Sequence, residues 1–481
     1  MEKFRNLIGG EWVTSSNGAT FENRNPANPE EVLGLFPSMT REDTRRAVES
    51  AREALPAWAE TPPPTRGAIL YRASQLIDER LEEIAVTLTR EEGKTLAEAR
   101  AEVARARDIF RYYAGEGWRM GGSVLPSNVH GEMLYTRREP LGVISIITPW
   151  NFPVAIPAWK IAPALVYGNT VVFKPASLAP QCSLMLVEAL VEAGLPPGVV
   201  NYVTGSGREV GDAMVIHPEV KGVSFTGSYE VGVQVYRRAA PAMKRVQLEM
   251  GGKNALVVLE DGDLDLAVQL AVRGGFGLTG QACTATSRVI VDEKIADAFV
   301  QGLCDAARSL VVGDGLDPAT QMGPAVSQEQ METDLEYVAI GKAEGAKLLV
   351  GGGIAKKGGY FVEPTVFDFV DPQMRLAQEE IFGPVIAVIR AKDFDEAITK
   401  TNTVAYGLVA GIVTSNLQRA FAFAEEADVG VVKVNEPTTG LALQAPFGGF
   451  KQSSANTFKE QGQSAIEFYT RIKTVYVGYG V

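Results

Sequence analysis

Cys283 is the strongest candidate for a reacting side chain in this sequence. It lies in GFGLTGQACTATSR, a segment rich in glycine, threonine and alanine. Such a turn predicts an accessible thiol, with backbone N–H groups that stabilise a thiolate. Cys182 and Cys304 fall inside apolar helical patterns and are expected to be buried. Three cysteines without a CxxC pair predict neither a disulfide framework nor a zinc site, as in a reducing cytoplasm.

A cysteine nucleophile needs a base and a donor for developing negative charge, and two segments offer them. LEMGGKN carries Glu249 at the end of a predicted strand, where partial burial would raise the pKa of the carboxyl group towards neutrality. TPWNFP carries Asn151 on a turn held rigid by prolines, and its amide suits an oxyanion hole together with the N–H of the cysteine. An isolated glutamate is more often a solvated surface residue. With only two histidines in the chain, a histidine base is not favoured.

Two glycine turns between a predicted strand and a predicted helix are candidate sites for a nucleotide phosphate. VTGSGREVG contains Gly205-x-Gly207-x-x-x-Gly211, which departs from G-x-G-x-x-G because its third glycine comes one residue late. FTGS puts Gly227 and Ser228 at a predicted helix N-terminus, where backbone N–H groups can hold a phosphate. Each turn alone is a weak signal, since glycine turns connect most βα units for structural reasons.

Two further segments could recognise the rest of a dinucleotide. The strand TVVFKPA ends in Lys174, and Ser177 follows where an NAD-specific fold usually has a carboxylate for the ribose. Lysine and serine bind hydroxyls without repelling a 2′-phosphate, so NAD and NADP both fit. The alternative interpretation of Lys174 is a surface lysine that follows a strand and binds no cofactor. EEIFGP adds Glu380 and Phe382, a carboxylate that could hold a ribose and an aromatic ring that could face a flat base.

The predicted elements around these side chains are those of an α/β protein. Residues 40–120 show a helical apolar period that begins at a Thr40 cap, and 122–140 predict a β-hairpin. From 141 to 260, short apolar strands alternate with helices, which predicts a doubly wound parallel sheet with ligands at the carboxyl ends of its strands. A second α/β stretch runs to about 445. The final AIEFYTRIKTVYVGYG alternates like a strand that pairs with the hairpin or with another subunit.

Length and charge limit the classes of function. A chain of 481 residues exceeds what one core supports, so two or three structural units are expected. A net charge of −12 makes nucleic acid a poor partner. No apolar run reaches the ~18 residues of a membrane span, and the N-terminus has no signal-peptide pattern. These features predict a cytoplasmic protein.

In order along the chain, these segments resemble the aldehyde dehydrogenase superfamily. TPWNFP, KPA, FTGS, LEMGGKN, GQACTA, EEIFGPV and PFGGFKQS occur in that family's order and at about its spacings, and the resemblance covers essentially the whole chain. It implies a Rossmann-type NAD(P)-binding domain (1–121 and 141–251) and an α/β catalytic domain (252–450). It also implies a small β element for oligomerisation (122–140 and 466–481), and hence a homodimer or homotetramer.

The resemblance further implies a reaction and a set of site residues. An aldehyde would be oxidised to a carboxylic acid through a thiohemiacetal and a thioester on Cys283, with Asn151 holding the oxyanion and Glu249 as the general base for hydrolysis. No metal is implied. Phe152, Trp159 and Phe447 would line an apolar substrate passage. NAD or NADP would be held by Thr148, Trp150, Lys174, Ser177, Gly207, Gly227, Ser228, Glu380 and Phe382.

Departures from the family pattern bear on the substrate. Ser177 stands where many NAD-preferring members have glutamate, which points to NADP or to both cofactors. Trp159 stands where semialdehyde-specific relatives often have arginine, which argues against a substrate that carries a carboxylate. The tail from 435 to 462, with Ser454 where glycine is usual, nevertheless resembles the branch that acts on 2-oxoglutarate semialdehyde, also called 2,5-dioxopentanoate. This aldehyde is the predicted substrate.

Several alternatives remain beside that prediction. The enzyme could be a succinate semialdehyde dehydrogenase or act on a broad range of aliphatic and aromatic aldehydes. A CoA-acylating relative would lack the base glutamate, and a non-catalytic relative would have lost the nucleophile or the oxyanion donor. Cys283, Asn151 and Glu249 are all present, which disfavours both. A cysteine hydrolase without a cofactor would leave the glycine turns unexplained.

Overall fold

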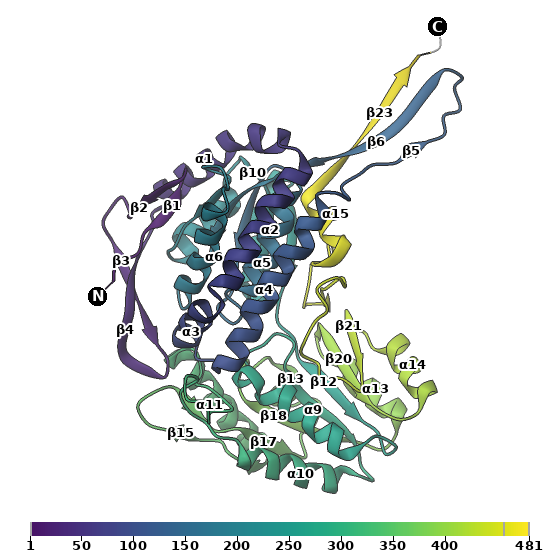
Figure 1. Ribbon diagram of the computed structural model, residues 1–481. Coiled ribbons are helices and arrows are strands. Elements are labelled where there is room, and N and C mark those ends of the chain that lie inside the picture. The colour runs from purple at the N-terminus through teal and green to yellow at the C-terminus, as the bar shows by residue number, and fades with distance from the viewer. Residues whose placement is uncertain (1, 456, 480–481) are drawn as a thin grey trace.

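A seven-stranded sheet forms the first half of the computed structural model, which describes residues 2–455 and 457–479 (Figure 1). Its strand order is β11-β10-β7-β8-β9-β1-β2, and the five strands from β11 to β9 run parallel. The predicted doubly wound sheet is thereby confirmed. Its strands are β1 (Asn6–Ile8), β2 (Glu11–Val13), β7 (Val143–Ile147), β8 (Thr170–Lys174), β9 (Val200–Tyr202), β10 (Val220–Thr226) and β11 (Arg245–Glu249).

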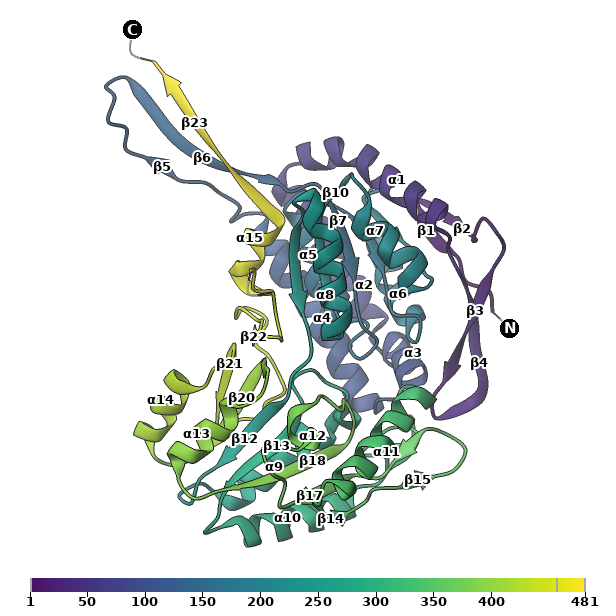
Figure 2. The same ribbon diagram turned by 180° about the vertical axis from the view of Figure 1, so that it is seen from behind.

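Helices cover both faces of this first sheet (Figures 1 and 2). The Thr40 cap is confirmed: its side chain accepts the N–H of Asp43, and the Asp43 carboxylate accepts the N–H of Thr40. The helix predicted after the glycine turn at Gly205 begins instead as a π-helical turn, Gly207–Gly211. The helices are α1 (Arg41–Glu60), α2 (Pro63–Glu79), α3 (Leu81–Glu92), α4 (Leu96–Glu116), α5 (Ala155–Val166), α6 (Pro180–Glu192), α7 (Asp212–Ile216) and α8 (Tyr229–Ala239).

A second seven-stranded sheet, in the order β14-β17-β18-β13-β12-β20-β21, organises the other half. All its neighbours pair in parallel except β14 with β17. Its strands are β12 (Asn254–Val258), β13 (Thr286–Asp292), β14 (Lys347–Val350), β17 (Thr365–Asp368), β18 (Val385–Ala391), β20 (Val409–Val413) and β21 (Val431–Val434). Its helices are α9 (Leu264–Phe276), α10 (Ala296–Ser309), α11 (Gln328–Ala343), α12 (Arg375–Gln378), α13 (Phe394–Asn402) and α14 (Leu417–Glu426).

A three-stranded arm projects from the body of the molecule (Figures 1 and 2). It consists of β5 (Val124–Leu125), β6 (Glu132–Pro140) and β23 (Thr470–Gly478), so the predicted hairpin and its pairing with the C-terminal strand are confirmed. The start predicted for the C-terminal strand is wrong, because its first residues form the short helix α15 (Ala465–Tyr469). Phe468 and Tyr469 are both buried, which a strand with alternating faces would not allow against one core. Residues 480 and 481 lie outside the described residues.

Three two-stranded sheets complete the fold. They pair β3 (Thr20–Asn25) with β4 (Asn28–Pro37), β15 (Ile354–Lys356) with β16 (Phe361–Val362), and β19 (Tyr406–Gly407) with β22 (Phe450–Lys451). No helix within 2–455 or 457–479 is long and apolar enough to cross a membrane. The residue boundaries predicted for the two domains stay a prediction.

Candidate active site

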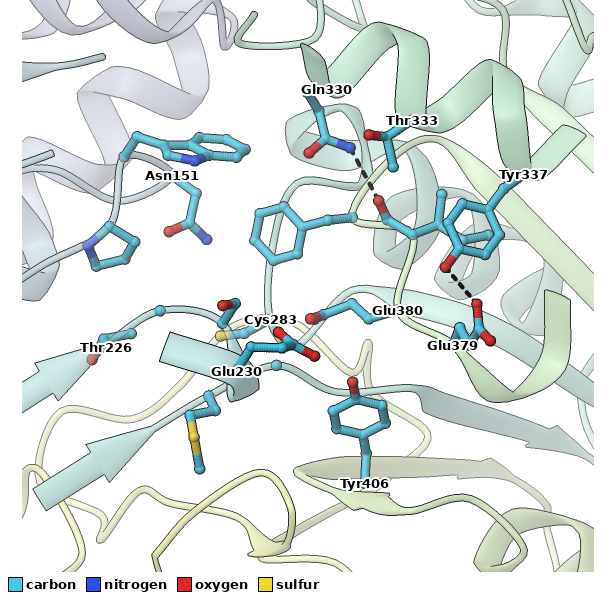
Figure 3. Close-up of a pocket in the computed structure, with 18 residues that line it drawn as sticks. Asn151, Thr226, Glu230, Cys283, Gln330, Thr333, Tyr337, Glu379, Glu380 and Tyr406 are labelled. Atoms are coloured by element: carbon cyan, nitrogen blue, oxygen red, sulfur yellow. Dashed lines mark hydrogen bonds between the residues drawn. The ribbon is translucent and has the colours of Figure 1, made fainter. Parts of the chain in front are cut away.

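A cleft of about 460 Å³ lies at the carboxyl ends of strands β10 and β11, where the two halves of the molecule meet (Figure 3). Seven of the sequence-predicted site residues line it, contributed by both halves. The lining consists of Pro149, Trp150, Asn151, Thr226, Gly227, Ser228, Glu230, Met250, Gly251, Cys283, Gln330, Thr333, Tyr337, Glu379, Glu380, Ile381, Phe382 and Tyr406.

Cys283 lies in the loop between α9 and β13, and its backbone is fixed from the neighbouring strand. The Asn254 amide donates to the carbonyl oxygens of Cys283, at 2.8 Å, and of Ala285, at 2.9 Å. Burial, together with the charges of Glu380 and Glu249, raises the pKa of the Cys283 thiol to about 12. The expectation that the turn stabilises a thiolate is therefore wrong: the lowering effect of a backbone N–H is outweighed, and the resting group is a thiol.

Asn151 points into the cleft beside Cys283, as Figure 3 shows. Its Nδ2 donates one N–H to the carbonyl oxygen of Gln281 at 3.0 Å, and its second N–H remains for a ligand. A buried ion pair holds its main chain: Lys94 Nζ donates to the Asn151 carbonyl oxygen at 2.7 Å and to Glu102 at 2.6 Å. Glu102 also accepts the N–H groups that open α5. Sequence reasoning missed this pair.

Glu249 ends β11 and is buried, but it does not line the cleft. Its carboxylate turns towards the C-terminal segment, where it accepts the Gly449 N–H at 3.3 Å and the Ser454 hydroxyl at 3.4 Å. A side chain at Gly448 would overlap this carboxylate. Burial raises the pKa of Glu249 well above its usual value, and the charge of Glu460 adds to that effect. A raised pKa favours the protonated form of Glu249, and the group can act as a base once it has lost that proton.

A second buried ion pair, Lys160 with Glu460, lies behind Glu249 and was not predicted. The Lys160 ammonium donates to Glu460 and, at 2.9 Å, to the hydroxyl of Ser224. Both partners are almost completely buried. A signal was available, because Lys160 is the one charged residue in the otherwise apolar helix α5, and such a residue needs a buried partner.

The half of the cleft beyond Cys283 has the features of a dinucleotide site. Ser228 caps α8 at the end of β10, and Gly227 has no room for a side chain against the ring of Phe225. The open N–H groups of this helix N-terminus suit a phosphate. Glu380 accepts the Gly252 N–H at 2.9 Å, and burial raises the pKa of its carboxyl group to about 7.

Aromatic rings face the same space. Trp150 and Phe382 meet edge to face with ring centres 5.3 Å apart, and Phe382 is held at a φ of 63°. A side chain at Gly251 would overlap the carboxylate of Glu380. The rings, the carboxylate and the helix N-terminus together fit a nicotinamide nucleotide.

Four predicted cofactor residues lie outside the lining of the cleft. Lys174 is buried, its Nζ donates to the Pro175 carbonyl oxygen at 3.1 Å, and burial lowers its pKa to about 8. Ser177 donates to the Gly205 carbonyl oxygen at 3.4 Å, and Gly207 opens the next turn. Thr148 is buried beside them, with its N–H bonded to the Lys174 carbonyl oxygen. They form a group at the ends of β7, β8 and β9.

The predicted substrate residues lie on the other side of Cys283. Trp159 and Phe447 are buried with ring centres 6.0 Å apart, and Phe447 packs in a small apolar cluster that Cys283 joins. The Phe152 ring lies 4.6 Å from the Lys94 ammonium. Trp159 comes from α5, Phe152 from the loop before α5, and Phe447 from the C-terminal segment.

Comparison with known proteins agrees with this geometry. A model of the aldehyde dehydrogenase family matches residues 12–475. The chain is 50% identical to alpha-ketoglutarate semialdehyde dehydrogenase of Haloferax volcanii, over 99% of each chain. It is 48% identical to 2,5-dioxopentanoate dehydrogenase of Saccharolobus solfataricus, over 98% of this chain and 99% of that protein.

Solved structures agree as well. Betaine aldehyde dehydrogenase of Staphylococcus aureus, in complex with NAD+, is 37% identical and superimposes with a TM-score of 0.97, covering 99% of this chain and 95% of that one. The chain therefore belongs to the aldehyde dehydrogenase family. As a member, it is an oxidoreductase that acts on aldehydes with NAD or NADP.

Proposed function

We propose that this protein oxidises 2-oxoglutarate semialdehyde to 2-oxoglutarate with NAD or NADP. Relatives at 47–50% identity over nearly the whole chain, from an archaeon to Bacillus subtilis, carry the name of that activity. The observation that carries the chemistry is the meeting of Cys283 and Asn151 in one cleft with Ser228 and Glu380. Nucleophile, oxyanion donor and dinucleotide features thus share one space.

The first step is assigned to Cys283 and Asn151. The thiol gives its proton to a water molecule in the cleft, and its sulfur attacks the aldehyde carbon to give a thiohemiacetal. The free N–H of the Asn151 amide and the backbone N–H of Cys283 donate to the oxyanion. Lys94 acts as a positioning residue, because it fixes the main chain that carries this amide. When bound, the cofactor supplies the acceptor of the hydride.

The second step is assigned to Glu249. Loss of hydride leaves an acyl group on the Cys283 sulfur, and a water molecule must attack its carbonyl carbon. Glu249 takes the proton of that water once its carboxylate turns from Gly449 and Ser454 towards the thioester. The acid leaves, and the thiol is restored. The raised pKa of Glu249 makes its carboxylate a stronger base for this step.

The remaining sequence-predicted residues are proposed to bind cofactor and substrate. Ser228 and the N-terminus of α8 would hold the pyrophosphate, Glu380 the nicotinamide ribose, and Lys174 with Ser177 the adenosine ribose. Lysine and serine leave room for a 2′-phosphate without charge repulsion, so we propose that both cofactors are used. Trp150, Phe382, Thr148, Gly207 and Gly227 would line the cofactor, and Phe152, Trp159 and Phe447 the aldehyde.

Initial rates of NAD and NADP reduction across a panel of aldehydes test this proposal. The panel holds 2-oxoglutarate semialdehyde, succinate semialdehyde, betaine aldehyde and neutral aliphatic and aromatic aldehydes. We expect the highest kcat/KM for the first, with both cofactors competent. A flat profile that favours neutral aldehydes would instead indicate a broad-range enzyme, and the substrate proposal would be wrong.

We also propose that the arm joins subunits into a homodimer or homotetramer. It projects from the body and exposes large apolar side chains, among them Val124, Ile472 and Tyr476. Light scattering of the full chain and of a Tyr476→Asp variant tests this. A wild-type protein that is monomeric at micromolar concentration would contradict it.

A further inference from the structure

Arg105 is a half-buried cation on α4 that has no carboxylate partner among the residues that the structure describes. One Nη donates to the carbonyl oxygen of Leu441, and the other donates to Oε1 of Gln461 at 2.9 Å. None of the ion pairs within residues 2–455 and 457–479 includes it. Burial lowers its pKa, which is the sign of a charge removed from water without a compensating anion.

Arg105 has fewer main-chain partners than Arg66 and Arg288, the two fully buried arginines of the described residues. Arg66 donates to four main-chain carbonyl groups and Arg288 to three, so both act as structural clamps. A guanidinium has five N–H groups, and Arg105 uses two. Among the described residues its Nε has no hydrogen-bond partner and is not fully buried, so a water molecule or a ligand can reach this donor.

The contacts of Arg105 connect it to the nucleophile. Leu441, whose carbonyl oxygen it binds, packs in the same small apolar cluster as Phe447 and Cys283. Gln461 follows Glu460, whose main chain pairs with that of Phe447. Arg105 therefore belongs to the wall that Leu441 and Phe447 form on the substrate side of Cys283. It is not among the residues that line the cofactor cleft.

Two further donors in this wall lack partners. Four buried side-chain nitrogens in the described chain have no hydrogen bond, and they belong to Trp58, Trp159, Lys253 and Gln461. Two of these residues, Trp159 and Gln461, are part of this wall. Gln461 is 1% exposed and is held at a φ of 62°, a conformation that costs a non-glycine residue free energy and is kept mainly where function requires it. Unsatisfied donors around a cation predict a ligand that offers only acceptors, as a 2-oxo carboxylate does.

We propose that Arg105, oriented by Gln461, binds the carboxylate of the substrate while the aldehyde carbon reaches Cys283. The inference rests on the proposed function, and it accounts for recognition of an anionic substrate by a chain that has Trp159 where semialdehyde-specific relatives often have arginine. The positive charge that binds the carboxylate would come from Arg105 on α4, whereas in those relatives the arginine stands at the position of Trp159 on α5. Gln461 is a positioning residue, because its Oε1 holds one Nη and leaves the other donors of the guanidinium to the ligand.

The test compares one charged and one neutral aldehyde of equal chain length, 2-oxoglutarate semialdehyde and pentanal, in Arg105→Met and Arg105→Lys. We expect Arg105→Met to lower kcat/KM for the semialdehyde about 10- to 100-fold, mainly through KM, and to leave pentanal within about threefold. Arg105→Lys keeps the charge without the planar fork and should fall between. Arg107→Met is the matched control, since Arg107 lies on the same helix and pairs with Asp78 and Asp108 at the surface.

Calorimetric binding of 2-oxoglutarate, the product, supplies a readout that does not depend on turnover, and Arg105→Met should weaken it by a similar factor. Equal losses for both aldehydes would make Arg105 a structural clamp for Leu441 and overturn the inference. An unchanged semialdehyde rate would overturn it too. If the wild-type protein neither oxidises the semialdehyde nor binds 2-oxoglutarate, the proposed function is wrong, and this inference is wrong with it. If the wild-type protein does both and Arg105→Met changes neither, only the inference about Arg105 is wrong.

Discussion

Replacing Glu380 by glutamine should make Cys283 more reactive, although it removes a residue assigned to cofactor binding. The pKa of the thiol is raised from 9.0 to about 12, first by burial and then by the charges of Glu380 and Glu249. That rise corresponds to about 4 kcal/mol against the thiolate. Glutamine keeps the shape of Glu380 and removes its charge, so part of this cost disappears.

The size of the effect follows from the charge. A carboxylate facing a partly desolvated thiol contributes on the order of 1.4 kcal/mol, or about one pKa unit. Below the pKa, a drop of one unit raises the thiolate fraction about tenfold. A less basic thiolate is a weaker nucleophile, with a Brønsted slope of about 0.4–0.5, so the net gain in rate at fixed pH is about three- to fourfold.

The assay is the rate of inactivation by iodoacetamide between pH 7 and 9 without cofactor. Glu230→Gln is the matched control, because Glu230 lines the same cleft but is not among the charges that raise the pKa of the thiol. We expect Glu380→Gln to react about three- to fourfold faster than the wild-type protein, and Glu230→Gln to react at the wild-type rate. Slower alkylation of Glu380→Gln, or an equal gain in both variants, would refute the electrostatic argument.

Three further predictions concern the base, the support of Asn151 and a helix cap. Burial and the charge of Glu460 raise the pKa of Glu249, so the basic form of Glu249 is gained as pH rises and kcat should increase with pH. Glu460→Gln should lower the pKa of Glu249 and move the rising limb of the kcat profile to lower pH. A rising limb at the wild-type pH would contradict this. Lys94→Met leaves buried Glu102 without its cation and should lower the free energy of unfolding by about 3–5 kcal/mol, seen as a lower urea midpoint, whereas a variant as stable as wild type would show that the pair is not needed. Thr40→Ala removes the cap of α1 and should cost about 1 kcal/mol by the same urea titration, with activity unchanged; a loss of activity at equal stability would count against a purely structural cap.

The sequence determined the local elements and the order of the motifs. The strand that ends in Lys174 and the helix that begins at the Thr40 cap follow from apolar runs and periods that are local properties of the chain, and the structure has both where they were predicted. Residues 466–469 were predicted as strand because the alternation of apolar and polar residues was taken to begin before Thr470. They form a helix in the structure, which buries both Phe468 and Tyr469 against the core. The sequence also identified Cys283 and Asn151 as partners, and the structure brings both to one cleft.

Only the tertiary structure decided how these groups are charged and supported. A pKa depends on burial and on charges that are distant in the chain, so the sequence could not foresee that the Cys283 thiol is made less acidic or that Glu249 faces Gly449 and Ser454. Contacts such as Lys160 with Glu460 and Arg105 with Gln461 join residues about 300 positions or more apart. Local spacing carries no record of such pairs, because they exist only once the two sheets and the C-terminal segment have packed together.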